Sequence, residues 1–204
     1  NDAHGNQIIG FYPGPNNPNR RSPETLPFID KIALAILGPE EPELTLRQGR
    51  ALFEHNVPLM VDPVQVIAAF SRDQIRELLS LAQYLVVNHH EFEVLKTNAE
   101  LTDKEVFDQV AEVILTHGDK GVTIYSRDGI CQVDAVRDVK VDEVTGCGDA
   151  FRAGYAYGIL NNLNLKERGQ VGCIMAARNL ENPETQRYRI TATELAELRA
   201  TIYG

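Results

Sequence analysis

Residues 144–154, VTGCGDAFRAG, combine residue types that can bind an anion and accept a proton side by side. Gly146 and Gly148 permit a backbone turn in which consecutive N–H groups converge on one point, and a helix that begins there adds the positive end of its dipole. Asp149 would stand in the first turn of that helix. Its carboxylate repels an anion, but it can take a proton from a hydroxyl group that attacks one. The stretch therefore predicts an anion hole formed by Gly146, Cys147 and Gly148, with Asp149 as catalytic base.

This combination is the minimum that a hydroxyl kinase needs. The transferred phosphoryl group requires a site that stabilises its developing negative charge, and the acceptor hydroxyl requires a base. The residues alone leave a structural alternative open. The glycines then form only a tight strand-to-helix turn, and Asp149 is a charge at a helix N-terminus. Cys147 is either a thiol whose pKa falls at that N-terminus or simply the small residue that the turn needs. Arg152 either reaches a phosphate or forms a surface ion pair.

Three segments, in the same order, resemble the ribokinase-like, PfkB-type carbohydrate and nucleoside kinases. TGCGDAFRAG is similar to the family signature, an acidic residue followed by T-G-A/C-G-D-x-F-x-x-G, although Glu143 stands where aspartate is usual. NHHE resembles the family's N-x-x-E, and ILTHGDKGVTIYSRDG resembles its T-x-G-x-x-G segment. The resemblance implies a phosphotransferase that uses ATP and Mg²⁺. It places Glu91 at the metal, through water, and the following residues at the nucleotide: Asn88, Thr116, Gly118 and Gly121.

The beginning of the chain, NDAHGNQIIGFYPG, resembles a bacterial branch of adenosine and sugar kinases with the pattern D-x-x-x-N-Q-x-x-x-F-x-P-G. The resemblance implies that Asn6, Gln7 and Gly14 contact the acceptor, with adenosine favoured over a sugar. It also implies a three-layer α/β/α sandwich with a mostly parallel sheet, in which residues 1–204 form a single kinase domain. The family's upstream segment, with a substrate-binding aspartate and lid strands, has no counterpart here, so we expect the chain to begin inside a longer gene product.

The elements that must position these residues follow from the hydrophobic pattern. Short apolar runs alternate with segments of helical period, as is typical of a parallel sheet covered by helices on both faces. Spacings of the type Ser/Thr-x-x-Glu/Gln predict helix starts at Ser71, Thr102 and Thr191. The apolar runs, which we interpret as strands, are QIIGFY, KIALAIL, VPLMVD, YLVVN and VILTH.

The second half of the chain adds a hairpin and further helices. Asp128-Gly129 supplies turn chemistry between two alternating segments of VTIYSRDGICQVDAV. Helices are expected over residues 148–161, over residues 165–180 and from residue 191 to the end, and a loop over residues 13–27. Asp62-Pro63 would end a strand at the carboxyl edge of the sheet, where ligand sites gather, with a loop cap as the alternative.

Composition excludes several classes of partner. A net charge of −9 argues against nucleic acid, and no apolar run approaches a membrane span. Three cysteines without a CxxC pair indicate neither a disulfide framework nor a zinc site, and they fit a cytoplasmic protein. His89 and His90 would face solvent rather than bind a metal. The expected partners are a sugar or nucleoside and ATP, and the oligomeric state, a homodimer included, stays open.

Two other functions remain open at this stage. The chain can be a non-catalytic, nucleotide-binding regulatory or scaffold protein derived from such a kinase, or a sugar-binding domain that uses no nucleotide. The presence of both TGCGD and NHHE argues against these alternatives, because a binding protein has no evident need for the base.

Overall fold

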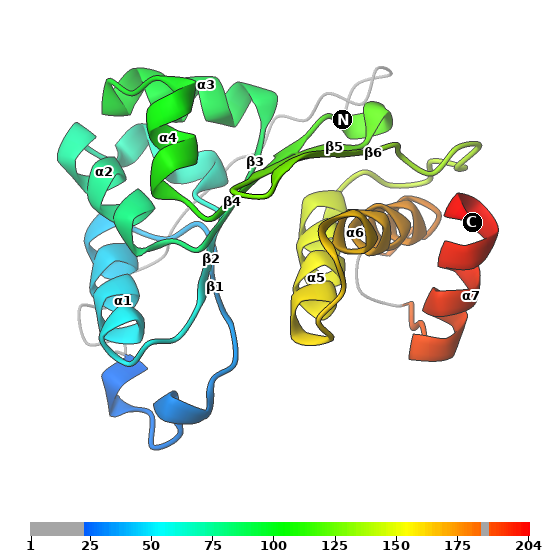
Figure 1. Cartoon of the computed structure of the whole chain (residues 1–204), viewed down its shortest axis with the longest axis horizontal. Helices are drawn as coiled ribbons and strands as arrows, with labels where there is room; N and C mark the ends of the chain where they lie inside the picture. Colours follow the sequence, from blue (N-terminus) through cyan, green and yellow to red (C-terminus); the bar gives the residue numbers. More distant parts are fainter. Residues whose placement is uncertain (1–22, 185–187) are drawn as a thin grey trace.

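A six-stranded sheet forms the centre of the molecule (Figure 1). The computed structural model describes residues 23–184 and 188–204. Within them the strands lie in chain order; β1 to β4 are parallel, and β5 and β6 are antiparallel to their neighbours. The strands are β1 (Ala35–Leu37), β2 (Leu59–Val61), β3 (Tyr84–Asn88), β4 (Glu112–Thr116), β5 (Val122–Ser126) and β6 (Gly129–Val133).

Four of the five apolar runs contain a strand, as predicted. The fifth, QIIGFY, lies outside the described residues. The run VPLMVD shows why such runs are continuously apolar: in β2, Leu59, Met60 and Val61 are all at most 1% exposed because both faces of the strand are covered. The predicted hairpin is also confirmed, with Ser126 paired to Gly129 at its turn.

Helices cover both faces of the sheet, which confirms the predicted α/β/α layers. Figure 1 shows α1 to α4 on one side, α5 and α6 on the other, and α7 beyond α6. One apolar core joins Leu85 and Val87 to the first four helices, and a second joins Met60, Val86 and Ile114 to α5 and α6. The helices are α1 (Pro42–Glu54), α2 (Arg72–Leu81), α3 (His89–Ala99), α4 (Asp103–Gln109), α5 (Cys147–Leu160), α6 (Leu165–Leu180) and α7 (Ala192–Tyr203).

All three predicted helix starts are reciprocal capping boxes, with Ser71, Thr102 and Thr191 as the N-caps of α2, α4 and α7. Two more boxes were not predicted, because their caps are asparagines, Asn88 before α3 and Asn164 before α6.

The predicted bounds of the last three helices agree with the structure to within a residue or two. The expected loop over residues 13–27 needs a small correction, since Pro23–Thr25 form a turn of 3-10 helix, while residues 13–22 lie outside the described part.

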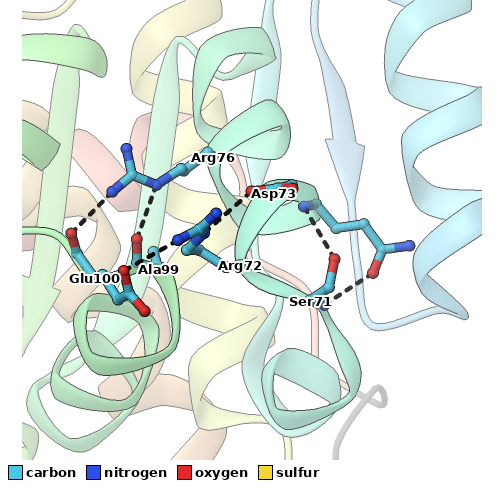
Figure 2. Close-up of polar contacts among 7 residues, drawn as sticks. Ser71, Arg72, Asp73, Arg76, Ala99 and Glu100 are labelled. Carbon is cyan, nitrogen blue, oxygen red and sulfur yellow. Dashed lines mark hydrogen bonds and ion pairs between the residues drawn. The ribbon is translucent and has the colours of Figure 1, made fainter.

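Side chains of α2 hold the end of α3 in place (Figure 2). Arg76 donates hydrogen bonds to the backbone carbonyl oxygens of Ala99 and Glu100, both at 2.9 Å. Glu100 has a left-handed backbone, with φ of 52°, and ends the helix. Arg76 thus satisfies carbonyl groups that a helix C-terminus leaves without partners, and it fixes the far end of the helix whose N-terminus is Asn88. No helix in the described part of the chain is both long enough and apolar enough to cross a membrane.

Candidate active site

A cleft of about 320 Å³ lies where the parallel strands end and α5 begins. The ends of β2, β3 and β4 contribute Asp62, Asn88 and Thr116, and the last two are direct neighbours in the sheet register. The cleft therefore occupies the carboxyl edge of the sheet, where open α/β sheets bind ligands. It brings together seven residues predicted from the sequence: Asn88, Glu91, Thr116, Gly146, Cys147, Gly148 and Asp149.

Two of the predicted residues that the structure describes are not among those that line the cleft. Gly118 and Gly121 follow β4 in the next loop. Gly121 has φ of 94°, and a Cβ atom built there would lie 2.1 Å from the carbonyl oxygen of Val133. Its backbone conformation and its close approach to β6 therefore require glycine, whatever else it contacts. Asn6, Gln7 and Gly14, predicted at the acceptor, lie outside the described residues.

The turn before α5 has the predicted helix-terminal form. Gly146 is the N-cap, with φ of 81° and ψ of 1°, a left-handed conformation that favours glycine. The Glu143 carboxylate accepts hydrogen bonds from the backbone N–H and the hydroxyl of Thr145, at 2.9 and 2.8 Å, and these bonds lower its pKa. Glu143 thus orders the approach to the turn. At the start of α5 the N–H of Cys147 donates to the carbonyl oxygen of Val144 at 3.3 Å, and the first intrahelical bond runs from the N–H of Ala150 to the carbonyl oxygen of Gly146 at 2.8 Å. The N–H groups of Gly148 and Asp149 lie in the first turn, where a helix provides no intrahelical acceptor and an anion can bind.

Gly148 does not share the left-handed backbone of Gly146, because its φ is not positive. A Cβ atom at this position would lie 3.3 Å from Nη1 of Arg152, so the end of that side chain would have to shift by a few tenths of an ångström. Glycine at this position thus leaves the guanidinium group undisturbed. Cys147 is half-buried, and burial raises the pKa of its thiol. Of the two interpretations of Cys147, the structure favours the small residue that the turn needs.

For Arg152 the sequence left two interpretations open, a phosphate contact and a surface ion pair, and the structure shows ion pairs formed by a mostly buried side chain. Its side chain is 14% exposed and forms ion pairs with both Asp62 and Asp149. Asp62 is fully buried, and burial raises its pKa to about 7, against the opposing effect of Arg152. Asp149, by contrast, is 78% exposed. The contact of Arg152 with Asp62 has no local signal in the sequence, and that with Asp149 is indicated only by the spacing of three residues on one helix.

Asn88 and Glu91 have a structural task in addition to their place in the cleft. The Asn88 side chain accepts a hydrogen bond from the backbone N–H of Glu91 at 2.9 Å, and Glu91 accepts one from the backbone N–H of Asn88 at 2.8 Å. This capping box begins α3. His89 and His90, between them, are exposed, as expected.

His117 contacts the Thr123 hydroxyl at 2.9 Å, and burial lowers its pKa.

Comparison with known proteins shows that the chain is similar to kinases. Residues 1–191 match the family described as pfkB family carbohydrate kinase. The nucleoside kinase of Methanothermobacter thermautotrophicus is 27% identical over 186 residues, which cover 91% of this chain and 60% of the relative. The nucleoside kinase of Methanocaldococcus jannaschii is 27% identical over 137 residues, which cover 67% of this chain and 45% of the relative. The chain thus spans about half the length of these relatives.

A solved structure that resembles this chain is also that of a nucleoside kinase. The nucleoside kinase of Burkholderia thailandensis in complex with inosine superposes with a TM-score of 0.84 at 31% identity, and the match covers 89% of this chain and 60% of that one. The same enzyme has also been solved in complex with ADP-inosine. A ribokinase of Arabidopsis thaliana, complexed with ribose and ATP, matches with a TM-score of 0.70 at 17% identity and supports the fold alone.

Proposed function

The chain belongs to the pfkB family of carbohydrate kinases and has its ribokinase-like fold, and from this premise we propose that its gene product moves the γ-phosphate of ATP to a hydroxyl group of a nucleoside. One observation carries the proposal: the exposed Asp149 carboxylate and the helix-terminal turn at Gly146 share a cleft at the carboxyl edge of the sheet. The names of the relatives support a nucleoside acceptor, and adenosine is our first candidate. We further propose that residues 1–204 belong to one kinase domain.

The proposed reaction assigns a task to each part of the cleft. The acceptor oxygen attacks the γ-phosphorus, the bond from that phosphorus to the bridging oxygen breaks, and ADP leaves. Asp149 takes the proton of the acceptor hydroxyl. The N–H groups of Gly146, Cys147 and Gly148 hold the transferring phosphoryl oxygens. Because the transition state is loose, the protein contributes mainly positioning and charge neutralisation.

The residues of the cleft fit Mg²⁺, which the family implies. Mg²⁺ binds proteins through one or two carboxylates and keeps waters and substrate phosphates as its other ligands. Glu91 and Asp149 supply carboxylates at the cleft, and within the described ranges no group of three His, Cys, Asp or Glu side chains is placed to hold a metal by itself. Glu91, through water, would hold the ion, and Asn88 would contact the phosphates. When bound, the metal neutralises phosphate charge.

The nucleotide itself would lie along the end of β4. Thr116 lines the cleft, and the loop that follows, with Gly118 exposed, continues from it. We propose that Thr116, Gly118 and Gly121 border the nucleotide and that Asn6, Gln7 and Gly14 contact the acceptor.

ADP release from Mg-ATP by the full-length gene product tests the proposal. We expect release that depends on the acceptor and is fastest with adenosine or inosine among a panel that includes ribose and phosphorylated sugars. Faster release with a sugar would move the acceptor class from nucleosides to carbohydrates. Mg-ATP binding without release for any acceptor would support the nucleotide-binding regulatory protein instead. Stabilisation by sugars with none by Mg-ATP would indicate the sugar-binding domain.

Glu91→Gln separates the metal task of Glu91 from its capping task. The amide oxygen of glutamine still accepts the backbone N–H of Asn88, so the capping box and the Tm are expected to stay nearly unchanged. The lost charge is expected to raise the Mg²⁺ concentration needed for half-maximal rate by roughly tenfold. A Mg²⁺ titration of the rate at fixed ATP measures this shift.

Glu105→Gln is the matched control, because Glu105 occupies the same capping position in α4 and does not line the cleft. Its Mg²⁺ titration should coincide with that of the unmodified protein. If Glu91→Gln behaves like this control, Glu91 is a helix cap and does not act at the metal.

A further inference from the structure

We propose that Arg152, anchored by the buried Asp62, positions the Asp149 carboxylate for proton transfer. This inference rests on the proposed function, in which Asp149 is the base. Three charged side chains form a row across the cleft, from the end of β2 to the start of α5: Asp62, Arg152 and Asp149.

Asp149 needs an external support because its own surroundings do not fix it. Its side chain is 78% exposed, in the first turn of α5. An exposed carboxylate samples several rotamers, and a base that is misplaced by about 1 Å loses roughly 10²-fold in rate. Arg152 lies one turn further along the same helix and is 14% exposed. Its Nη2 contacts the Asp149 carboxylate, and this contact selects one carboxylate position.

Arg152 can provide that support because its guanidinium is held from the other side. Its Nη1 forms an ion pair with Oδ2 of Asp62. Since the guanidinium is a rigid planar fork, one carboxylate on each Nη fixes the direction of both contacts. Lysine has a single nitrogen and would not reproduce this geometry.

Asp62 connects the row to the central sheet. Its backbone N–H donates to the carbonyl oxygen of Leu37 at 2.9 Å, which continues the pairing of β1 with β2. Its side chain is fully buried, and neither of its carboxylate oxygens has a hydrogen-bond partner within residues 23–184 and 188–204, so its contact with Arg152 is an ion pair only. A buried carboxylate with unsatisfied oxygens is a poor source of stability. A function that uses its charge explains the aspartate better than packing does.

Gly148 gives independent support. Its φ does not require glycine, but a Cβ atom there would lie 3.3 Å from Nη1 of Arg152. The glycine therefore leaves the guanidinium undisturbed in its place between the two carboxylates.

Steady-state kinetics of Asp62→Asn, Arg152→Met and the double variant, made in the full-length gene product, test the inference. We expect kcat to fall roughly 10- to 100-fold in each single variant, with KM for Mg-ATP changed less than about twofold. The double variant should lose no more than Arg152→Met alone, because both changes break one row. Arg152→Lys should recover little of the rate.

Arg168→Met is the matched control. Arg168 forms a similarly buried ion pair with Glu112, at 19% and 15% exposure, and neither residue lines the cleft. This control is expected to lower Tm and to leave kcat unchanged. A purely structural task for Arg152 would give the same pattern in Arg152→Met, and that result would overturn the inference, as would a rise in KM for ATP at constant kcat.

The inference and the proposed function can fail separately. If Asp149→Asn abolishes turnover while Asp62→Asn and Arg152→Met retain it, Asp149 is the base and the row does not position it. If no acceptor supports turnover, the proposed function fails, and crystal structures of the unmodified protein and of Asp62→Asn decide the inference. An Asp149 carboxylate that keeps its position without the charge of Asp62 would overturn it, and a displaced carboxylate would support it.

Discussion

Replacing Asp149 with asparagine is expected to lower kcat by roughly 10²- to 10⁴-fold, because the variant keeps the shape of the side chain and loses its ability to accept a proton. ATP affinity should change little, since the amides of the anion turn and the loop after β4 are untouched. Acceptor-dependent ADP release and equilibrium binding of Mg-ATP, measured on the same preparation, give both quantities. The variant should unfold at nearly the same temperature because Asp149 is mostly exposed.

Asp128→Asn is the control for this change. It is the same substitution, at the second of the two turn residues between the paired Ser126 and Gly129, a position that asparagine suits as well as aspartate. We expect full activity from it. A rate close to normal in Asp149→Asn would mean that another group takes the proton, and the assignment of the base would have to be withdrawn.

Gly121→Ala is expected to cost about 3 kcal/mol or more in the free energy of unfolding. Gly121 has φ of 94° and ψ of −134°, a region essentially restricted to glycine. A methyl group there would also lie 2.1 Å from the carbonyl oxygen of Val133 and 2.6 Å from the backbone nitrogen of Ala135, so β6 would have to move. Urea denaturation, followed by circular dichroism, measures the loss.

Gly118→Ala, three residues earlier in the same loop, provides the comparison. Gly118 also has a positive φ, of 60°, but no atom lies within 4 Å of the position that a Cβ would take. We therefore expect a loss of only about 1–2 kcal/mol, the cost of a left-handed conformation. Equal losses in the two variants would show that the contact with β6 does not constrain Gly121. A weaker affinity for ATP in Gly118→Ala, without unfolding, would place Gly118 at the nucleotide.

The layers of the fold could be predicted from the sequence because their signals are local. The continuous apolar run VPLMVD indicates a strand that is buried on both faces. The capping boxes at Ser71 and Thr102 indicate helix starts, and each box spans only four residues of the chain. The two asparagine caps were not predicted, because the pattern Ser/Thr-x-x-Glu/Gln does not include asparagine. Asn88 and Asn164 make the same reciprocal bonds.

The cleft was predictable only in part. Gly146 could be assigned from its type, since its left-handed backbone is a local property. The contact between Asp62 and Arg152 could not, because 90 positions separate the two residues and only the packing of α5 against the sheet brings them together. Gly148 was assigned to the turn from its residue type, but its φ is not positive, and the side chain nearest to a Cβ atom there is Arg152, one helical turn further along.

The order of the strands bears on how the protein folds during synthesis. Each described strand pairs with the one made just before it, so the sheet can grow strand by strand as the chain leaves the ribosome. One face of that sheet, with Met60, Val86 and Ile114, is covered only when α5 and α6 emerge. The nascent chain therefore carries an open apolar face, a suitable surface for a chaperone, until residues 147–180 dock. Asp149 and Arg152 are part of α5. The cleft therefore cannot form before α5 packs against the sheet.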